Sequence, residues 1–201
     1  MELASLIYPA PKSSYTLDNR GLVLVPKFDV SKVTKGLQTG AKISDMGIPC
    51  MYLPANDDSS IVLLYFHANA EDINLGFQFI RVLRDTLDVH VLSIEYPGYG
   101  QYEGKPSEDD ILKDAETVYD FLTDHLKIPQ SSIHIFGRSL GTGPSVHLSS
   151  IRNPGSVTLM SAYLSIRQAG ASLVGSSLYI NISRSRNDGK RVIERSIHKL
   201  R

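Results

Sequence analysis

The sequence predicts an α/β fold with a doubly wound, mostly parallel β-sheet. Predominantly apolar segments at 61–66, 89–96, 133–136 and 157–160 have the length of strands, and 61–66 shows no alternation of apolar and polar residues. A continuous apolar run is typical of a parallel strand that is covered on both faces. Segments with apolar residues at helical spacing separate these strands, so strands and helices alternate along the chain, as this fold class requires.

The chain has 201 residues, of which 42% are hydrophobic and 21% charged. This length and composition predict one globular domain. The net charge of zero argues against a protein that binds nucleic acid as a whole. The charge is uneven, because residues 164–201 contain eight Lys or Arg and two acidic residues. We therefore divide the chain into an extended lead-in (1–20), a main domain (21–167) and a basic, poorly packed tail (168–201).

The single cysteine, Cys50, excludes an intrachain disulfide and a cysteine zinc cluster. We expect it to be a small apolar residue in a strand. No apolar run approaches the roughly 20 residues of a membrane span, and no signal-peptide pattern opens the chain. We expect a cytoplasmic protein that associates with membranes at most peripherally, without a cofactor or a metal.

The first half of the chain contains three predicted strands and one predicted helix. Prolines favour an extended conformation near residues 6–12. Strands are predicted over 21–28, 48–53 and 61–66. A helix is predicted over 73–87, with an apolar stripe formed by Leu75, Phe79, Val82, Leu83 and Leu87.

In the second half of the chain, predicted strands and helices alternate again. A strand over 89–96 ends in the tight loop Pro97-Gly98-Tyr99-Gly100. Ser107 is a predicted N-cap for a helix that runs to about Leu126. The strand 133–136 leads into Gly137-Arg138-Ser139-Leu140-Gly141, and a second helix is predicted directly after it.

A strand that turns into a helix at Gly-x-Ser-x-Gly is the pattern of a nucleophile elbow. The glycines allow close backbone approach around a serine in strained geometry, and the following helix directs free N–H groups toward an oxyanion. The alternative interpretation is a glycine-rich turn without chemistry. The strand before Ser139 and the helix after it favour the elbow.

Four segments together resemble a known family. They are 65–70 (YFHANA), 95–100 (EYPGYG), 137–143 (GRSLGTG) and the lead-in 8–11 (YPAP) with Tyr15. Their order and spacing resemble those of serine α/β-hydrolases, in particular the serine-aminopeptidase-like branch that includes the alpha/beta hydrolase domain-containing protein depalmitoylases. The resemblance covers about residues 6–167 and implies the α/β-hydrolase fold.

The resemblance implies a role for several residues. Ser139 is the expected nucleophile, and the backbone N–H groups of Leu140 and Asn69 are the expected oxyanion donors. Ala68 stands where relatives usually have glycine, which reduces backbone freedom in that loop. His67 is expected to fix the loop rather than to transfer protons. Arg138 either orients an anionic group near the serine or is solvated or salt-bridged.

The expected acid and base are not found in the sequence. In this family they follow the serine in the order acid, then histidine, after two further strands. The histidines after Ser139 are His147, on the helix behind it, and His198 in the basic tail. Asp188 precedes His198 by only ten positions, which is short for an acid–base pair. The tail has the apolar spacing of a short amphipathic helix rather than of the further strands, so we expect a sheet that lacks its C-terminal strands.

The predicted function is hydrolysis of esters or thioesters, with S-acylated protein cysteines as the substrate class, by a site whose triad is incomplete in this chain. The alternative is a non-catalytic module that binds a partner protein through the strand at 157–160, left open at the sheet edge.

Overall fold

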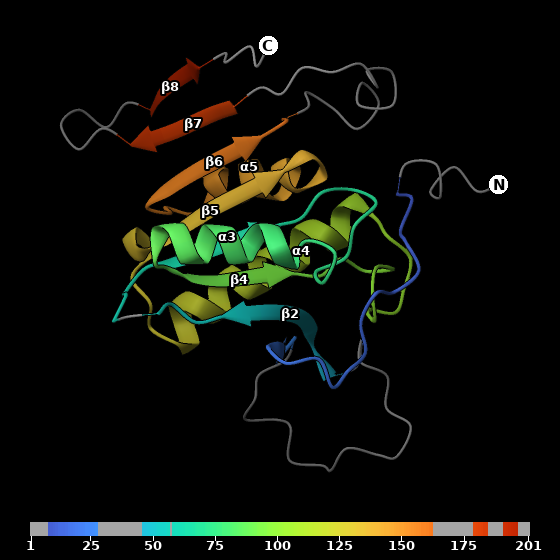
Figure 1. The fold of residues 1–201 in the computed structure, drawn as a ribbon. Coiled ribbons are helices and arrows are strands. Elements are labelled where there is room, and N and C mark those ends of the chain that lie inside the picture. The colour runs from blue at the N-terminus through green and yellow to red at the C-terminus, as the bar shows by residue number, and fades with distance from the viewer. Residues whose placement is uncertain (1–7, 28–45, 57, 163–178, 185–190, 197–201) are drawn as a thin grey trace.

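The computed structural model describes residues 8–27, 46–56, 58–162, 179–184 and 191–196. Within these residues, eight strands form one sheet in the order β1-β2-β4-β3-β5-β6-β7-β8 (Figure 1). The strands are β1 (Leu22–Val25), β2 (Ile48–Leu53), β3 (Val62–Phe66), β4 (His90–Ile94), β5 (Ile133–Arg138), β6 (Ser156–Met160), β7 (Tyr179–Arg184) and β8 (Arg191–Ser196).

The centre of the sheet is parallel. β4, β3, β5 and β6 are neighbours in that order, and each adjacent pair runs in the same direction. The antiparallel strands lie outside this group, with β1 and β2 on one side and β7 and β8 on the other. The predicted mostly parallel sheet is therefore confirmed.

Helices cover both faces of the sheet. α3 (Phe77–Leu87) lies over one face, and α4 (Glu108–Asp120) and α5 (Thr142–Ile151) lie together over the other (Figure 1). A π-helical turn, Phe121–His125, continues α4 close to the predicted end of that helix. The crossovers between parallel strands place helices on both faces, as a doubly wound fold requires.

The core has two parts because alternate residues of a strand face opposite sides of the sheet. Val62, Leu64 and Phe66 of β3 belong to the cluster under α4 and α5, whereas Leu63 and Tyr65 belong to the cluster under α3. All five residues are buried. The absence of alternation in this segment therefore follows from burial on both faces. Cys50 is likewise buried in β2, as predicted.

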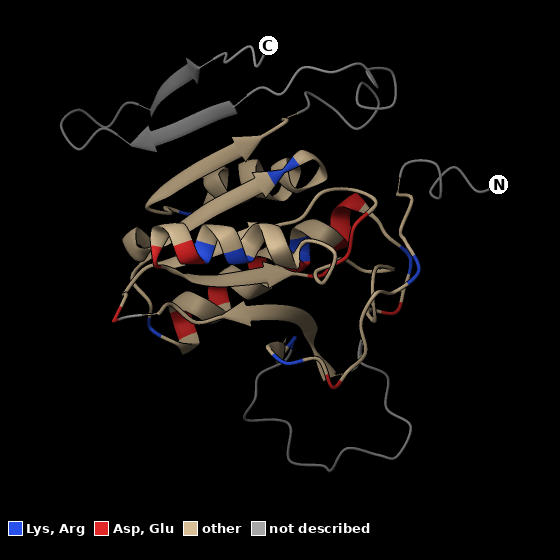
Figure 2. Ribbon diagram, viewed as in Figure 1, with Lys and Arg blue, Asp and Glu red and all other residues tan. Residues whose placement is uncertain are grey.

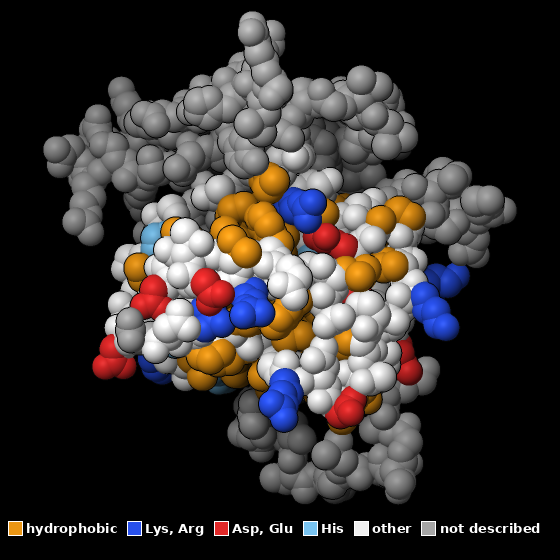
Figure 3. Space-filling view, in the orientation of Figure 1, with side chains coloured by type: hydrophobic (Ala, Val, Ile, Leu, Met, Phe, Trp, Pro, Cys, Tyr) orange, Lys and Arg blue, Asp and Glu red, His pale blue; other side chains and the backbone are white. Residues whose placement is uncertain are grey.

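The predicted apolar stripe of α3 is confirmed only for Phe79 and Leu83, which pack against the core. Leu75, Val82 and Leu87 are more than half exposed, and the residue of this helix that is fully buried is Ile80. The helix begins at Phe77, after a turn, so Leu75 is not on it. Apolar side chains gather in patches on the molecular face that carries α3 (Figure 3). Charged residues of both signs lie side by side on the same helix (Figure 2), where Arg81 pairs with Asp85.

β5 and β6 differ from β3, because both alternate between buried and partly exposed residues. In β6, Val157 and Leu159 are buried while their neighbours are partly exposed. One face of these two strands is therefore less covered than the corresponding face of β3.

The sheet continues beyond β6, which corrects two expectations. β7 pairs antiparallel with β6, and β8 with β7, so β6 is not an open edge and residues 191–196 are a strand rather than a helix. The unpaired N–H and C=O groups of an edge strand offer ready partners to an extended segment. Antiparallel outer strands need no continuous apolar run, so the sequence criterion missed them. The partner-binding alternative loses the open edge on which it rested.

Candidate active site

Ser139 lies at a sharp turn between β5 and α5. Its φ is 48°, in the left-handed region, which is rare for a residue with a side chain. A single 3₁₀ turn, Ser139–Gly141, connects the strand to the helix. Ser139 is partly exposed. Strained backbone of this kind persists only where the surroundings over-determine it, and it clusters at functional sites.

Close packing explains both glycines of the motif. A Cβ on Gly137 would lie 2.3 Å from Ser145 Oγ and 2.4 Å from the Gly141 carbonyl oxygen. A Cβ on Gly141 would lie 2.1 Å from the Phe66 carbonyl oxygen. Thr142 Oγ1 donates to the Ser139 carbonyl at 2.7 Å and holds the turn. The close approach predicted from the motif is therefore present.

The segment His67–Asp72, here called the oxyanion loop, follows β3 at the sheet edge where Ser139 follows β5. The register pairs Phe66, the last residue of β3, with Gly137 of β5. The carboxyl ends of neighbouring parallel strands thus bring Asn69 and the Ser139–Leu140 turn to the same edge. The residue of the loop in the left-handed region is Ala70, with φ 61°. Ala68 does not have a positive φ, so an alanine there causes no backbone strain, although relatives usually have glycine.

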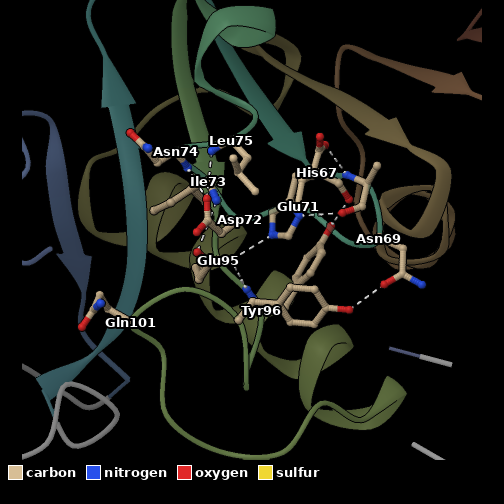
Figure 4. A network of polar contacts seen from close by, with 12 residues as sticks. His67, Asn69, Glu71, Asp72, Ile73, Asn74, Leu75, Glu95, Tyr96 and Gln101 are labelled. Carbon is tan, nitrogen blue, oxygen red and sulfur yellow. Dashed lines mark hydrogen bonds and ion pairs between the residues drawn. The ribbon is translucent and has the colours of Figure 1, made fainter. Parts of the chain in front are cut away.

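His67 is fully buried and holds the loop together (Figure 4). Its Nδ1 lies 2.9 Å from the Ala68 carbonyl oxygen, and its Nε2 lies 2.9 Å from Glu95 Oε1. Since the carbonyl oxygen only accepts, Nδ1 carries a proton and donates to it. Both ring nitrogens are engaged within the loop and its support, as expected for a structural histidine.

Two tyrosines anchor the loop from the segment after β4. The Tyr96 hydroxyl donates to the His67 carbonyl oxygen at 2.8 Å (Figure 4). The Tyr99 hydroxyl donates to Asn69 Oδ1 at 2.6 Å. The rings of Tyr96 and His67 lie 4.0 Å apart between centroids. Two aromatic side chains of the segment at 96–100 are therefore in contact with the oxyanion loop.

Glu95 is the buried centre of this support, which sequence reasoning did not identify. Besides His67, its carboxylate accepts from the Tyr15 hydroxyl at 2.9 Å and from the Ile73 N–H at 3.3 Å. Burial and the Glu95 charge raise the pKa of Tyr15 far above its usual 10, so the hydroxyl keeps its proton and donates. A Cβ on Gly100 would lie 2.2 Å from Glu95 Oε2, which explains the glycine. The sequence feature that could have identified Glu95 is an acidic residue at the end of a predominantly apolar strand.

The lead-in is bound to the same loop through Asp72, a second missed residue. The fully buried carboxylate of Asp72 accepts from Ser14 N at 2.7 Å and from Ser14 Oγ at 2.6 Å. It also accepts from the backbone N–H groups of Asn74 and Leu75, at the turn that precedes α3 (Figure 4). The extended lead-in is thus part of the site's support.

Arg138 is salt-bridged. Its Nη1 lies 3.2 Å from Glu71 Oε2 and 3.4 Å from Glu71 Oε1. Glu71 Oε1 also accepts the Ala68 N–H at 2.8 Å. The carboxylate therefore joins the residue before the nucleophile to the backbone of the oxyanion loop.

The contacts given for the five histidines that the structure describes are with residues other than Ser139. His67 pairs with Glu95, His147 with Glu116 at 2.7 Å, and His134 with Ser156 at 2.7 Å. The ring of His90 contacts Tyr52 and Ser59, and that of His125 lies beside Phe121. Asp188 and His198 lie outside the described residues.

No group of three or more His, Cys, Asp or Glu in the described ranges is arranged to hold a metal, and no helix in them is long and apolar enough to cross a membrane. A mostly apolar cavity of about 600 Å³ lies beside β1, the π-helical turn and Val62, the first residue of β3. Since ligands of open α/β sheets bind at the carboxyl ends of the strands, this cavity at the amino end is separate from the site at Ser139.

Comparisons with known proteins agree with this architecture. The chain is 29% identical over 173 residues to alpha/beta hydrolase domain-containing protein aho-3 of Caenorhabditis elegans, covering 81% of this chain and 52% of that protein. It is 30% identical over 145 residues to protein bem46 of Schizosaccharomyces pombe, covering 72% of this chain and 47% of that protein. The chain spans about half the length of these curated relatives.

The structural comparison concerns the fold. A crystal structure of an alpha-beta hydrolase from Vibrio vulnificus matches with a TM-score of 0.52 and 20% identity, covering 64% of this chain and 47% of that one. No protein-family model matches the chain. By its sheet order, its strand-to-helix turn at Ser139 and these similarities, the chain has the α/β-hydrolase fold and is related to the alpha/beta hydrolase domain-containing proteins.

Proposed function

We propose that this chain carries the nucleophile and the oxyanion donors of a serine hydrolase that acts on esters or thioesters. The observation that carries the proposal is the left-handed Ser139, with φ 48°, held between two glycines that leave no room for a side chain. Such strain costs about 1–3 kcal/mol and is found where exposing the serine serves a function.

The proposed chemistry is acyl transfer through the Ser139 hydroxyl. Oγ attacks the carbonyl carbon of the substrate while a base removes the hydroxyl proton. The N–H groups of Leu140 and Asn69 stabilise the negative charge on the tetrahedral oxygen. The alcohol or thiol leaves with the proton, and water then hydrolyses the acyl-enzyme. The base has to come from outside the described residues.

S-acylated protein cysteines are the proposed substrate class. This finer assignment is supported by the resemblance of the four sequence segments to depalmitoylases. Acylated proteins lie at membrane surfaces, so the proposal places this protein in the cytoplasm and peripherally at membranes.

The test is thioester hydrolysis and labelling by a fluorophosphonate probe, which reports an activated serine. The protein used carries the C-terminal part of a relative in place of residues 164–201, which supplies the family's acid and histidine. Ser139→Ala should abolish both signals, whereas Ser150→Ala, on the exposed face of α5, should leave them unchanged. Activity that survives Ser139→Ala, or its absence in this protein, would refute the proposal.

A further inference from the structure

We propose that the Arg138–Glu71 ion pair is a positioning device that sets the oxyanion loop at a fixed distance from the nucleophile. The inference rests on the proposed function, since it assigns residues to the geometry of that site. Arg138 immediately precedes Ser139, and Glu71 lies in the loop that contains Asn69. The guanidinium and the carboxylate are 3.2 Å apart.

Glu71 transmits the position of Arg138 to the backbone of the loop. Its Oε1 accepts the Ala68 N–H at 2.8 Å, one residue before the proposed donor Asn69. The side chain of Glu71 is 16% exposed and that of Arg138 is 35% exposed, so water screens the pair only partly. A continuous series of contacts therefore connects Ser139 to Asn69 through Arg138, Glu71 and Ala68.

Neighbouring rings fix the direction of the arginine. The Arg138 guanidinium lies 5.5 Å from the centroid of Phe79, on α3, and Phe79 in turn packs against Phe136 and Tyr65. Burial raises the pKa of the Tyr65 hydroxyl above its usual 10; the nearby Glu71 charge raises it further, and Arg138 lowers it. A guanidinium held by a ring on one side and by a carboxylate on the other has little freedom to swing toward solvent.

The other anchors of the loop come from a different strand. Glu95, Tyr96 and Tyr99 follow β4 and hold His67 and Asn69 from that side. The Arg138–Glu71 pair holds the loop from β5, the strand that leads into Ser139. The pair thus fixes the spacing between the two halves of the proposed oxyanion hole, because Leu140 moves with β5 and Asn69 moves with the loop.

Spacing matters because oxyanion donors act only within about 2.7–3.1 Å of the developing charge. A misplacement of 1 Å can lower the rate by about 100-fold. Loss of the pair should therefore slow the reaction of Ser139 more than it weakens the fold.

The first experiment measures amide hydrogen exchange of Ala68 in the full chain by NMR. Arg138→Gln and Glu71→Ala should accelerate exchange of the Ala68 N–H, and Arg138→Lys should restore part of the protection. Glu71→Gln keeps the oxygen that accepts the Ala68 N–H but removes the charge, so its effect should be intermediate. The matched control is Arg152→Gln, which breaks the 2.7 Å pair with Asp120 between α5 and α4, away from the loop.

The second experiment measures the fluorophosphonate labelling rate of Ser139 in the protein that carries a relative's C-terminal part. We expect the labelling rate to decrease by about 10- to 100-fold in Arg138→Gln and to recover in part in Arg138→Lys. In Arg152→Gln the labelling rate should stay unchanged, even where this variant loses as much free energy of unfolding as Arg138→Gln.

The outcomes separate the two proposals. Unchanged Ala68 exchange in Arg138→Gln, or an equal change in Arg152→Gln, would overturn the positioning role even if Ser139 reacts normally. Unchanged labelling of Arg138→Gln would overturn it as well. If Ala68 exchange responds as expected while no form of the protein is labelled at Ser139, the hydrolase assignment fails and the structural coupling of the loop to β5 stands.

Discussion

At the scale of single residues, the site depends on a few backbone positions with close contacts or an unusual conformation. Gly137 and Gly141 bring β5, β3 and α5 within contact distance, and Ser139 occupies a conformation normally left to glycine. These three positions lie at one turn, so the packing of the sheet edge imposes the geometry of the nucleophile.

Gly137→Ala should destabilise the fold by about 1–3 kcal/mol, the usual cost of overpacking, because the added methyl would overlap a backbone oxygen. Urea denaturation measures the change. Gly76→Ala is the control, since the nearest heavy atom there is 3.7 Å from the added Cβ and the effect should stay within about 0.5 kcal/mol. Equal stability of the two variants would contradict the packing argument.

His134 should make stability depend on pH. Burial lowers the pKa of His134 below its usual 6.5, so the folded state favours the neutral ring. Below about pH 6.5 the unfolded chain binds the proton more readily, and the free energy of unfolding decreases until the pH is below the lowered pKa. Above pH 6.5 this stabilisation is complete.

The measurement compares the free energy of unfolding of the wild type and of His134→Gln between pH 8 and pH 5. The difference between them should shrink or reverse as the pH falls. Exposed His125→Gln controls for the loss of one imidazole. A difference that stays constant with pH would show that His134 does not contribute in this way.

At the scale of elements, α4 shows how a local signal fixes a helix. Ser107 is its N-cap, and the Ser107 side chain accepts from the Asp110 N–H at 3.1 Å. Glu108, Asp109 and Asp110 fill the first turn, where the helix dipole favours negative charge. The cap predicted from the sequence is therefore present.

Ser107→Ala should cost about 1 kcal/mol of stability, because the Asp110 N–H loses its acceptor. Thr117→Ala is the control within the same helix. The Thr117 hydroxyl donates back to the Lys113 carbonyl oxygen, a bond that adds little to a helix, so its loss should be neutral or slightly favourable. Thermal denaturation of both variants distinguishes the cap from a general effect of removing a hydroxyl.

The basic segment 183–201 is predicted to be the first part of the chain that trypsin cleaves. Its charge is dense and its apolar content is low, so it can contribute little to the core. Time-resolved limited proteolysis with mass spectrometry identifies the first cuts. Early cleavage between 61 and 163, with resistance at the tail's Lys and Arg, would contradict the prediction.

At the scale of the whole molecule, the sheet edge assembles one part of the proposed hydrolase site, the serine and its surroundings. The carboxyl edge of the parallel strands brings Ser139, the oxyanion loop and the lead-in together. The contacts of the five described histidines are with residues other than Ser139, so the proposed hydrolase activity requires a base from outside the described residues.

The chain alone should therefore show little labelling by a fluorophosphonate and slow thioester turnover. A site that keeps oxyanion donors but lacks its base and acid retains at most about 10³–10⁴ over the reaction in water. Activity-based labelling of the purified chain measures this. Strong labelling that is lost in both Ser139→Ala and His198→Ala would show that the tail supplies the base, and the expectation of an incomplete triad would be wrong.

The sequence by itself determined the central strands, the order of strands and helices, the cap at Ser107 and the turn at Ser139. These features are encoded by neighbouring residues, through apolar runs, capping side chains and glycine spacing, so local patterns suffice. The face of α3 that packs on the sheet was predicted only in part. Phe79 and Leu83 pack against the core as predicted, but Leu75 lies in a turn and the fully buried residue is Ile80.

Only the tertiary structure decided how the site is supported and how the sheet ends. Glu95 and Asp72 bind residues 80 and 58 positions away, Tyr15 and Ser14, and no local pattern contains such contacts. β7 and β8 pair antiparallel at the end of the sheet and need no continuous apolar run, so the criterion that identified the central strands missed them. The Arg138–Glu71 pair became visible for the same physical reason, because only folding brings the ends of β3 and β5 to one edge of the sheet.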